Sequence, residues 1–498
     1  MNTELRVFYE EYKRKSAAYQ FVLASVQFDQ MTIIPSSGLL YSHKMYSILE
    51  REYLTYAFSP ENTEKLRELR IITTDESLRE ELTLRLRNHR EINVAPKSVY
   101  RDFRKSEIQV RQYWERAKRT NDFSLIEPCL QSLVENRKSI LRYVEHDGSN
   151  YDFLLDQCQM NLNKEKYDLF FSKVKERLIP LLQQIRKYGR AIDTELLRKT
   201  YSVEKQKKFV AALKEVLQIN SETCLIVEGT THPFCLSLSC KDIRFTTRYV
   251  ADNIMSAILL TAHEYGHALY HLQINDEFVN TSFSSEIGLA MQESQARFME
   301  NHIVRNPHFW NILYLKLQQL FPEHLERTTI DGFTDMIQAT TPNLIRNNAD
   351  ELTYPLHILI RYELELEMFD GNISFDSLNK LWRNKYEEYL GIRPNTLEEG
   401  ILQDIHWRNA YFGYFPTYAI GSAFAAQFYQ QLEKDIDVRS ALQNNNFEKI
   451  THWLRENIHQ YGASKTYDEI LIGATNESFN PQYYINYLED KYTKLYSL

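Results

Sequence analysis

The sequence is poor in the two residues that interrupt regular structure. It has 14 glycines and 13 prolines among 498 residues, about half of their usual combined share of roughly 12%. Sandwiches, propellers and Rossmann-type sheets need more turn residues than this. Because 25% of the residues are charged and 43% are hydrophobic, the composition predicts a mainly α globular protein with a large core.

Cysteine and long apolar runs are also scarce. The five cysteines are odd in number and form no Cys-x-x-Cys pair, which argues against a disulfide framework and a cysteine-ligated metal site. The chain has no run of 18 apolar residues, and its charged start lacks the apolar core of a signal peptide. The net charge of -8 is mild and gives no reason to expect nucleic acid as a partner. We therefore predict a cytoplasmic protein that binds neither membrane nor nucleic acid.

Apolar residues recur with helical spacing over most of the chain. The stretch from Asn163 to Tyr188 predicts one helix that is kinked at Pro180 and ends at Gly189. The stretch from Phe447 to Ile458 predicts another, with Gly462 as its stop.

The chain shows no internal repeat and no low-complexity linker. The length alone would allow about three average domains, but no boundary is visible in the sequence. We therefore predict a single catalytic domain over residues 1–498. Its N-terminal half, about 1–220, is helical, and its second half, about 221–498, carries a strand and the candidate site.

One stretch breaks the helical rhythm. Residues from Thr231 to Tyr249 are rich in β-branched and aromatic types and alternate with a period of two, which predicts strand structure. Asp242 and Arg244 then lie on one face of the strand, and Ile243 and Phe245 lie on the other. A charged, solvated face of a surface hairpin is one interpretation. In the other, Asp242 and Arg244 bind substrate on a strand along which an extended peptide lies by β-addition.

The next segment carries the strongest chemical pattern. Residues 252–273 form an apolar helical run that contains His263-Glu264-Tyr265-Gly266-His267. Two histidines four residues apart share a helical face, so both imidazoles can reach one Zn²⁺, with the glutamate beside them as general base. Two surface histidines on an ordinary helix are the alternative, but the run is too apolar for a surface helix. The pattern therefore predicts His263 and His267 as metal ligands and Glu264 as the catalytic base.

Spacing defines the third ligand less well. The chain has Tyr270 and Gln273 where the metzincin extension requires Gly and His, so that class is excluded. His271 continues the i+4 series, but it lies about 12 Å along the helix axis from His263, too far for both to bind one ion. A carboxylate from the helical segment 284–304 remains. The candidates that spacing leaves open are Glu286, Glu293 and Glu300.

Six short blocks follow one another along the chain. They are His232-Pro233-Phe234, Asp242-x-Arg244-x-Thr246, His263-Glu264-x-x-His267, Glu293-Ser294-Gln295, Ile345-Arg346-x-x-Ala349-Asp350 and Gly400-x-x-Gln403-Asp404-x-His406-Trp407. In this order they resemble the carboxypeptidase Taq (thermostable carboxypeptidase 1) family of zinc metallocarboxypeptidases. Weaker likeness extends to both ends, so the resemblance covers nearly the whole chain. Each block alone is weak evidence for the resemblance, whereas all six in the same order are specific to the family.

The resemblance implies a fold, an activity and an assembly. The fold is a mainly α, elongated body with a deep central active-site groove and a small β-sheet next to the zinc-binding helix. Glu293 is implied as the third ligand of one Zn²⁺ per subunit, and cobalt or manganese suits the same ligands. The implied activity is release of amino acids from peptides with a free C-terminus, with broad specificity but poorly on C-terminal proline. A homodimer is also implied.

The substrate contacts are candidates that combine chemistry with this resemblance. An exopeptidase must recognise a terminal carboxylate, for which arginine offers a bidentate fork. Arg346 is the candidate, and an ordinary i,i+4 helix pair with Asp350 is its alternative. His406 and Tyr414 are candidate donors to the oxyanion that develops during hydrolysis, and a core histidine beside Trp407 is the alternative for His406.

One position departs from the family pattern, and other functions compete. Gln292 stands where the family has histidine, and it carries no proton at neutral pH. This departure puts the pH profile or the substrate fit in doubt more than the metal site. His232 is expected to be architectural. The competing functions are an oligoendopeptidase or dipeptidase of related helical architecture and a catalytically silent peptide-binding protein. An oligoendopeptidase or a dipeptidyl-type peptidase would release fragments larger than one amino acid.

Overall fold

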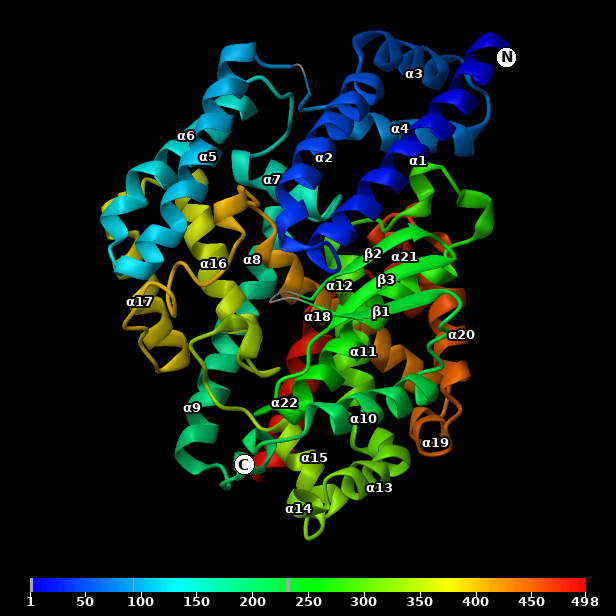
Figure 1. Cartoon of the computed structure of the whole chain (residues 1–498). Helices are drawn as coiled ribbons and strands as arrows, with labels where there is room; N and C mark the ends of the chain where they lie inside the picture. The colour runs from blue at the N-terminus through cyan, green and yellow to red at the C-terminus, as the bar shows by residue number, and fades with distance from the viewer. Residues whose placement is uncertain (1–2, 93, 230–232) are drawn as a thin grey trace.

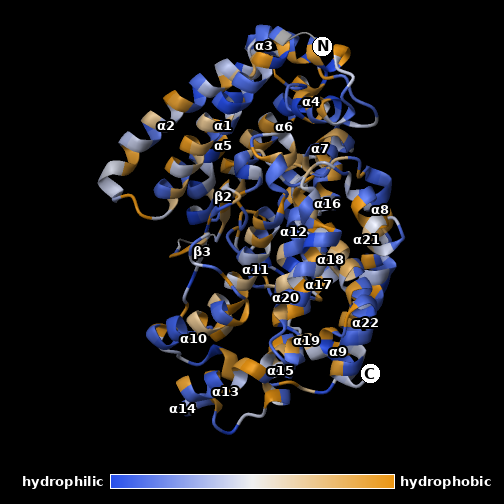
Figure 2. Cartoon of the chain, turned by 90° about the vertical axis from the view of Figure 1, so that its right-hand side faces the viewer, coloured by the Kyte–Doolittle hydropathy of each residue, from blue (hydrophilic) through white to orange (hydrophobic). Residues whose placement is uncertain are grey.

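The computed structural model describes residues 3–92, 94–229 and 233–498. It is built almost entirely of helices, with one three-stranded sheet, and it is taller than it is wide in two perpendicular views (Figures 1 and 2). The predicted fold class, an elongated mainly α body with a small sheet, is confirmed. His232 lies outside the described residues. Within the described ranges, no helix is both long and apolar enough to cross a membrane.

Four helices form an N-terminal unit with a small core of its own. They are α1 (Thr3–Met31), α2 (Ser36–Ala57), α3 (Pro60–Ile72) and α4 (Glu76–Arg87). Leu5 and Tyr9 of α1 pack there with Leu66 and Leu69 of α3 and Leu82 of α4. This cluster is separate from the main hydrophobic core, so the unit is a distinct packing element within the chain.

The remaining helices surround one contiguous core. Those that precede the sheet are α5 (Lys97–Thr120), α6 (Glu127–Leu141), α7 (Asn150–Cys158), α8 (Lys164–Lys173), α9 (Ile179–Tyr188) and α10 (Val203–Val216). Those that follow it are α11 (Ile254–Gln273), α12 (Leu289–Arg297), α13 (Trp310–Leu320), α14 (Pro322–Leu325), α15 (Ile330–Gln338), α16 (Tyr354–Phe369), α17 (Leu378–Leu390), α18 (Phe415–Asp435), α19 (Val438–Gln443), α20 (Phe447–Asn457), α21 (Tyr467–Thr475) and α22 (Gln482–Tyr496).

The helix predicted from Asn163 to Tyr188 is present but contains a π-helical turn. The Asn163 side chain caps α8 by accepting a hydrogen bond from the backbone N–H of Lys166 at 3.2 Å. The π turn covers Val174–Leu178, and Pro180 lies in the first turn of α9. Because proline supplies no backbone N–H, a change of helical register just before it accommodates the residue. Gly189 follows α9 as predicted.

The predicted C-terminal helix is also present, but Gly462 is not its stop. Helix α20 ends at Asn457, and a 3₁₀ turn, His459–Tyr461, separates it from Gly462. The glycine has a φ of 47°, and a Cβ there would lie 2.2 Å from the carbonyl oxygen of Phe283. Gly462 is therefore required by a close approach between two loops.

The sheet lies against the helix that carries the histidine pair. Strands β1 (Cys224–Glu228), β2 (Cys235–Ser239) and β3 (Asp242–Thr247) are ordered β1-β3-β2, with β1 parallel and β2 antiparallel to β3. Ile243 and Phe245, which we predicted to share one face of the strand, are both buried, and α11 packs on β3. Both edges of β3 are hydrogen-bonded to other strands. A peptide therefore cannot add to the strand of Asp242 and Arg244, and that part of the prediction is wrong.

Three helices meet in the middle of the body. Helix α12 packs there against both α11 and α18, between the α1–α4 unit above and α13–α15 below (Figure 2). The sequence of each is apolar on several faces, as expected for helices that are covered all round. The functional residues that they carry are thus held by a rigid interior.

Candidate metal centre and active site

Three potential ligands converge between α11 and α12. His263 and His267 of α11 each place Nε2 3.9 Å from Oε2 of Glu293 of α12. One ligand atom from each of the three lies within 4.8 Å of the others. Two imidazole nitrogens and one carboxylate oxygen are a donor set suited to a divalent ion such as Zn²⁺, whose catalytic sites have three protein ligands and a fourth position for water. The residues present therefore fit a catalytic metal.

Two glycines allow these helices to approach closely enough. A Cβ at Gly266 would lie 2.4 Å from the carbonyl oxygen of Gln295, and a Cβ at Gly421 would lie 2.8 Å from Cβ of Glu293. No other residue fits at either contact without moving the backbone. Gly266, within the histidine motif, sets the contact of α11 with α12, and Gly421 sets that of α12 with α18. Glu293 is positioned by both.

The other two carboxylates that spacing left open lie elsewhere. Glu300 places Oε2 3.1 Å from Nδ1 of His263, on the side of the ring away from Glu293. Glu286 lies 3.8 Å from Nε2 of His271, outside the cluster of three. The structure therefore brings Glu293, and neither alternative, to the two Nε2 atoms, and it leaves His271 outside as expected.

Arg297 ties the carboxylates of this region together. Its Nε donates to Oε1 of Glu293 at 2.7 Å, and its Nη1 donates to Oε2 of Glu300 at 3.1 Å. Glu293 thus has one oxygen held by a guanidinium and the other facing the imidazoles. Outer partners of this kind fix the orientation of ligands.

The two imidazoles differ in their electrostatic surroundings. Burial lowers the pKa of His267 well below its usual range, and His263 adds to this effect. Burial also lowers the pKa of His263, but the carboxylates of Glu293 and Glu300 outweigh it, and the net shift is upward. A neutral His267 has a lone pair available for a cation, and Glu300 leaves Nε2 of His263 as the nitrogen that faces the cluster.

Glu264 lies inside the site and is buried. It is only 4% exposed, and its Oε2 has no hydrogen-bond partner among the described residues. Burial raises its pKa to about 7, with a contribution from the negative charge of Glu293 and an opposing one from His263. A carboxyl with a pKa near neutrality is suited to accept and return a proton.

Arg346 is held rigidly, although not in the helix pair that its sequence spacing allows. It lies in a 3₁₀ turn, Arg346–Asn348, is 6% exposed, and donates through Nε to Oδ1 of Asp404 at 2.9 Å. Its Nη1 donates to the hydroxyl of Tyr354 at 3.0 Å. Asp350 instead accepts from Thr340 and from nearby backbone N–H groups. The helix-pair alternative is therefore wrong.

The second anchor of Asp404 is another buried arginine. Arg361 of α16 donates through Nε to Oδ2 of Asp404 at 2.8 Å. Its guanidinium carbon lies over the ring of Trp382, 4.5 Å from the ring centroid. Both arginines hold the pKa of Asp404 far below its usual range, against burial, which raises it. One carboxylate thus pairs with two guanidinium groups, so these three side chains together carry one net positive charge.

His406 and Tyr414 lie together with a further tyrosine. His406 places Nε2 3.1 Å from the hydroxyl of Tyr418, and its ring is 5.2 Å from that of Tyr414. It packs on Phe415 at 4.1 Å, whereas Trp407 turns away and donates its indole N–H to Glu365. His406 is thus part of a polar cluster, and the indole of Trp407 is occupied elsewhere.

Asp242 and Arg244 are paired with each other. Arg244 donates through Nε and Nη2 to the two carboxylate oxygens at 3.0 and 2.8 Å, and its guanidinium lies over the ring of Phe28 of α1. None of the contacts found in the described ranges joins this pair to the metal ligands. Its visible role is to fasten α1 to the outer face of the sheet.

The chain is similar to known metallopeptidases over nearly its whole length. A model of the carboxypeptidase Taq (M32) metallopeptidase family matches residues 8–492. The chain belongs to this family. It is therefore an enzyme, a metallocarboxypeptidase. Carboxypeptidase 1 of Bacillus subtilis is 35% identical over 100% of both chains, and thermostable carboxypeptidase 1 of Thermus thermophilus is 30% identical over 98% of both.

Solved structures agree with the family assignment. An M32 carboxypeptidase from Deinococcus radiodurans has a TM-score of 0.94 at 26% identity over 98% of both chains. A Pyrococcus furiosus carboxypeptidase has a TM-score of 0.92 at 29% identity over 99% of both. A putative oligoendopeptidase F has a TM-score of 0.55 at 14% identity over 97% of this chain and 96% of that one, a likeness of fold alone.

Gln292, where we expect this carboxypeptidase to depart from the family pattern, lies outside the ligand cluster. Gln292 Nε2 lies 2.9 Å from Nε2 of His271, the histidine one turn beyond His267. The Gln292 side chain therefore contacts His271 and is not one of the three convergent side chains.

Sequence reasoning missed Arg297, Tyr354 and Tyr418. Arg297 follows Glu293 by four residues, a spacing that indicates a helical ion pair and could have been recognised. Tyr354 and Tyr418 carry no such signal, because the sequence has 33 tyrosines and only the tertiary structure brings these two to the site.

Proposed function

We propose that this protein is a zinc-dependent carboxypeptidase that removes single amino acids from the free C-terminus of peptides. We propose broad specificity, with poor release of C-terminal proline, in keeping with the family. The observation that carries the proposal is the convergence of His263, His267 and Glu293 beside the buried Glu264, within a network that also holds Arg346. This arrangement combines the parts for hydrolysis with a cation for a terminal carboxylate.

His263, His267 and Glu293 would hold one Zn²⁺ per subunit, and cobalt or manganese would suit the same donors. When bound, such an ion polarises a carbonyl and acidifies water near neutral pH. Other side chains of the protein orient these ligands. Glu300 holds the ring of His263 through Nδ1, and Arg297 holds Glu293 through Oε1.

Glu264 is the proposed proton carrier. Its carboxylate would accept a proton from the attacking water and deliver it to the amine that leaves. His406 and Tyr414 would donate hydrogen bonds to the carbonyl oxygen as negative charge develops on it. The hydroxyl of Tyr418, 3.1 Å from Nε2 of His406, would orient that ring.

Arg346 is the proposed contact for the terminal carboxylate. Asp404 takes one edge of its guanidinium and Tyr354 takes part of the other, which leaves donors of a planar fork for a ligand. A substrate carboxylate would meet the positive charge that Asp404 leaves unbalanced between two arginines. Arginine is suited to this role because it can bind both carboxylate oxygens at once.

The test compares matched peptides that end in a free or an amidated C-terminus. Arg346→Ala should lower kcat/KM on the free peptide by roughly 30- to 1,000-fold and change the amidated peptide little, because the amide never makes the contact. Arg346→Lys should recover only part of the loss. Arg177→Ala, which removes a surface arginine paired with Glu489, serves as the control. An unchanged ratio in Arg346→Ala would contradict the proposed carboxylate contact.

We also propose that the enzyme is a cytoplasmic homodimer, with peptides as its partners. Light scattering should then give a mass near twice the 59.2 kDa of one chain. A mass of one chain over the working concentration range would contradict the dimer.

A further inference from the structure

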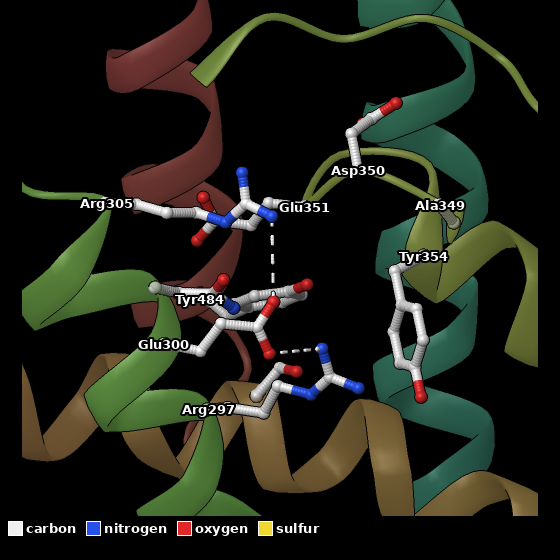
Figure 3. A pocket seen from close by; sticks show the side chains of 10 residues that line it. Arg297, Glu300, Arg305, Ala349, Asp350, Glu351, Tyr354 and Tyr484 are labelled. Atoms are coloured by element: carbon white, nitrogen blue, oxygen red, sulfur yellow. Dashed lines mark hydrogen bonds and ion pairs between the residues drawn. The ribbon is translucent and has the colours of Figure 1, made fainter. Parts of the chain in front are cut away.

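Tyr354 lies between the metal-ligand network and Arg346, the proposed contact for the terminal carboxylate. It is the first residue of α16 and is 5% exposed. Figure 3 shows its ring beside the Arg297 guanidinium, with Glu300 between Arg297 and Arg305. The tyrosine contacts one residue of the metal-ligand network with its ring and one residue of the proposed carboxylate site with its hydroxyl.

The ring contact leads to the metal ligands. The guanidinium carbon of Arg297 lies 4.1 Å from the centroid of the Tyr354 ring, a close cation–π stack in a desolvated place. Arg297 in turn holds Oε1 of Glu293 at 2.7 Å and Oε2 of Glu300 at 3.1 Å. Through these bonds, the position of the ring bears on both Glu293 and His263.

The hydroxyl contact leads to Arg346. Its Nη1 donates to the Tyr354 hydroxyl at 3.0 Å, while Nε donates to Asp404. Asp404 fixes one edge of the guanidinium, and Tyr354 fixes the nitrogen at the opposite end. Without the hydroxyl, the guanidinium could still pair with Asp404 and stack on Tyr418, but it would have lost the hydrogen bond that holds Nη1.

The surroundings leave Tyr354 little room to move. The cavity that it lines with Arg297, Glu300 and Arg305 has a volume of about 10 Å³, enough for about one water molecule. The cavity is therefore no substrate site, and the packed interior transmits a change at one contact to the other.

We propose that Tyr354 is a positioning residue that sets the separation between the metal ligand Glu293 and the carboxylate-binding Arg346. The inference rests on the proposed function of these two residues. An enzyme that removes one residue at a time must hold the terminal carboxylate and the scissile carbonyl one residue apart, a span of about 3.5 Å of extended chain. Tyr354 contacts both Arg297, which holds Glu293, and Arg346, so one side chain fixes the distance between the two sites.

The test separates the two contacts of Tyr354. Tyr354→Phe removes the hydroxyl and keeps the stacked ring, whereas Tyr354→Leu removes both. Tyr354→Phe should raise KM for a peptide with a free C-terminus roughly tenfold, with a smaller change in kcat, and leave the amidated peptide and the Zn²⁺ affinity unchanged. Tyr354→Leu should in addition weaken Zn²⁺ binding roughly tenfold, measured on metal-free protein against a competing chelator.

The control is Tyr484→Phe, which removes a hydroxyl from the same cavity (Figure 3) at a residue of α22. It should match the wild type in KM and in Zn²⁺ affinity. If Tyr354→Phe retains the wild-type free-to-amidated ratio while Arg346→Ala loses it, the positioning role is wrong and the carboxylate role stands. If Arg346→Ala also keeps the ratio, the carboxylate role itself fails, and the proposed coupling falls with it. Should Tyr354→Leu not fold, the Phe variant alone decides the question.

Discussion

At the residue scale, burial gives Glu264 a chemistry that an exposed glutamate lacks. Its pKa is raised to about 7 by burial, and its Oε2 has no protein partner among the described residues. Both features suit a group that exchanges protons with water and not with the protein. Its neighbours His263 and His267 are the proposed metal ligands, so loss of metal and loss of the base can be separated by mutation.

Glu264→Gln should abolish turnover and keep the metal, because the amide cannot accept a proton while the three ligand side chains remain. The expected kcat is below about 1% of the wild type, within the range for loss of general acid–base catalysis. Metal content of the purified variant by elemental analysis should equal that of the wild type. Activity above that level would remove Glu264 from the mechanism.

Glu293→Ala and His271→Ala make a matched pair for the ligand assignment. Glu293 lies 3.9 Å from both Nε2 atoms, whereas His271 is bonded to Gln292. Loss of a ligand should exceed the roughly 10- to 100-fold drop in metal affinity typical of an outer-shell change. Native mass spectrometry should show Glu293→Ala largely metal-free and His271→Ala loaded. The reverse pattern would refute the assignment.

Individual residues were predictable where local spacing carries the chemistry. The histidine pair is visible in the sequence because helical geometry alone places both imidazoles on one face. Arg346 was a candidate only through its resemblance block, and its true partners, Asp404 and Tyr354, lie 58 and 8 residues away in sequence. Such contacts depend on how helices pack, and no local pattern records that.

At the scale of elements, the α1–α4 unit is stabilised by its own small core. Polar contacts tie it to the body, among them those of Glu81 with the backbone N–H of Ser282 at 2.8 Å and of Arg87 with Asp156 at 2.7 Å. Elements with a small separate core open at lower free-energy cost than those in the main core. A change of charge on a buried side chain should therefore alter the opening of this unit more visibly than the opening of the main core.

His89 makes the stability of this unit dependent on pH. Its ring packs on Phe58 and its Nδ1 lies 2.9 Å from the Thr63 hydroxyl. Burial lowers its pKa from 6.5 to about 4, with a further effect of Arg85. The unfolded chain therefore binds the proton more readily between these values. The stability that the neutral, buried His89 contributes to the folded unit is fully present above pH 6.5 and is lost as the pH falls through about 4.

The free energy of unfolding of the α1–α4 unit should fall by on the order of 3 kcal/mol between pH 7 and pH 4. Hydrogen exchange of peptides from α1–α4 should show it in the wild type and not in His89→Gln. His452→Gln, at an exposed histidine of α20, should behave as the wild type does. An equal pH dependence in the wild type and in His89→Gln would contradict this role of His89.

Element boundaries followed the sequence where apolar spacing was regular. The stretch from Asn163 to Tyr188 was recognised as helical, but the π turn at Val174–Leu178 was not, because apolar spacing does not distinguish it from α-helix. The strand of Asp242 was also recognised. Its central place in the sheet was not, because pairing with β1 and β2 depends on the whole chain. The mistaken β-addition followed from that.

At the scale of the whole molecule, low glycine and proline content was the most informative feature. It predicted a mainly helical body, and one contiguous core from Val110 to Tyr496 explains why no domain boundary was visible in that part of the sequence. The same core buries the network that joins Glu293, Arg297, Tyr354 and Arg346. We propose that this buried network makes the enzyme an exopeptidase.

The most direct test follows one peptide over time by mass spectrometry, in its free and its C-terminally amidated form, with and without a chelator. The proposed function predicts a ladder of products that each lose one C-terminal amino acid from the free peptide. It predicts little cleavage of the amidated peptide and no cleavage after the metal is removed. Internal fragments formed equally from both peptides, or a ladder that persists in a protein shown to be metal-free, would contradict it.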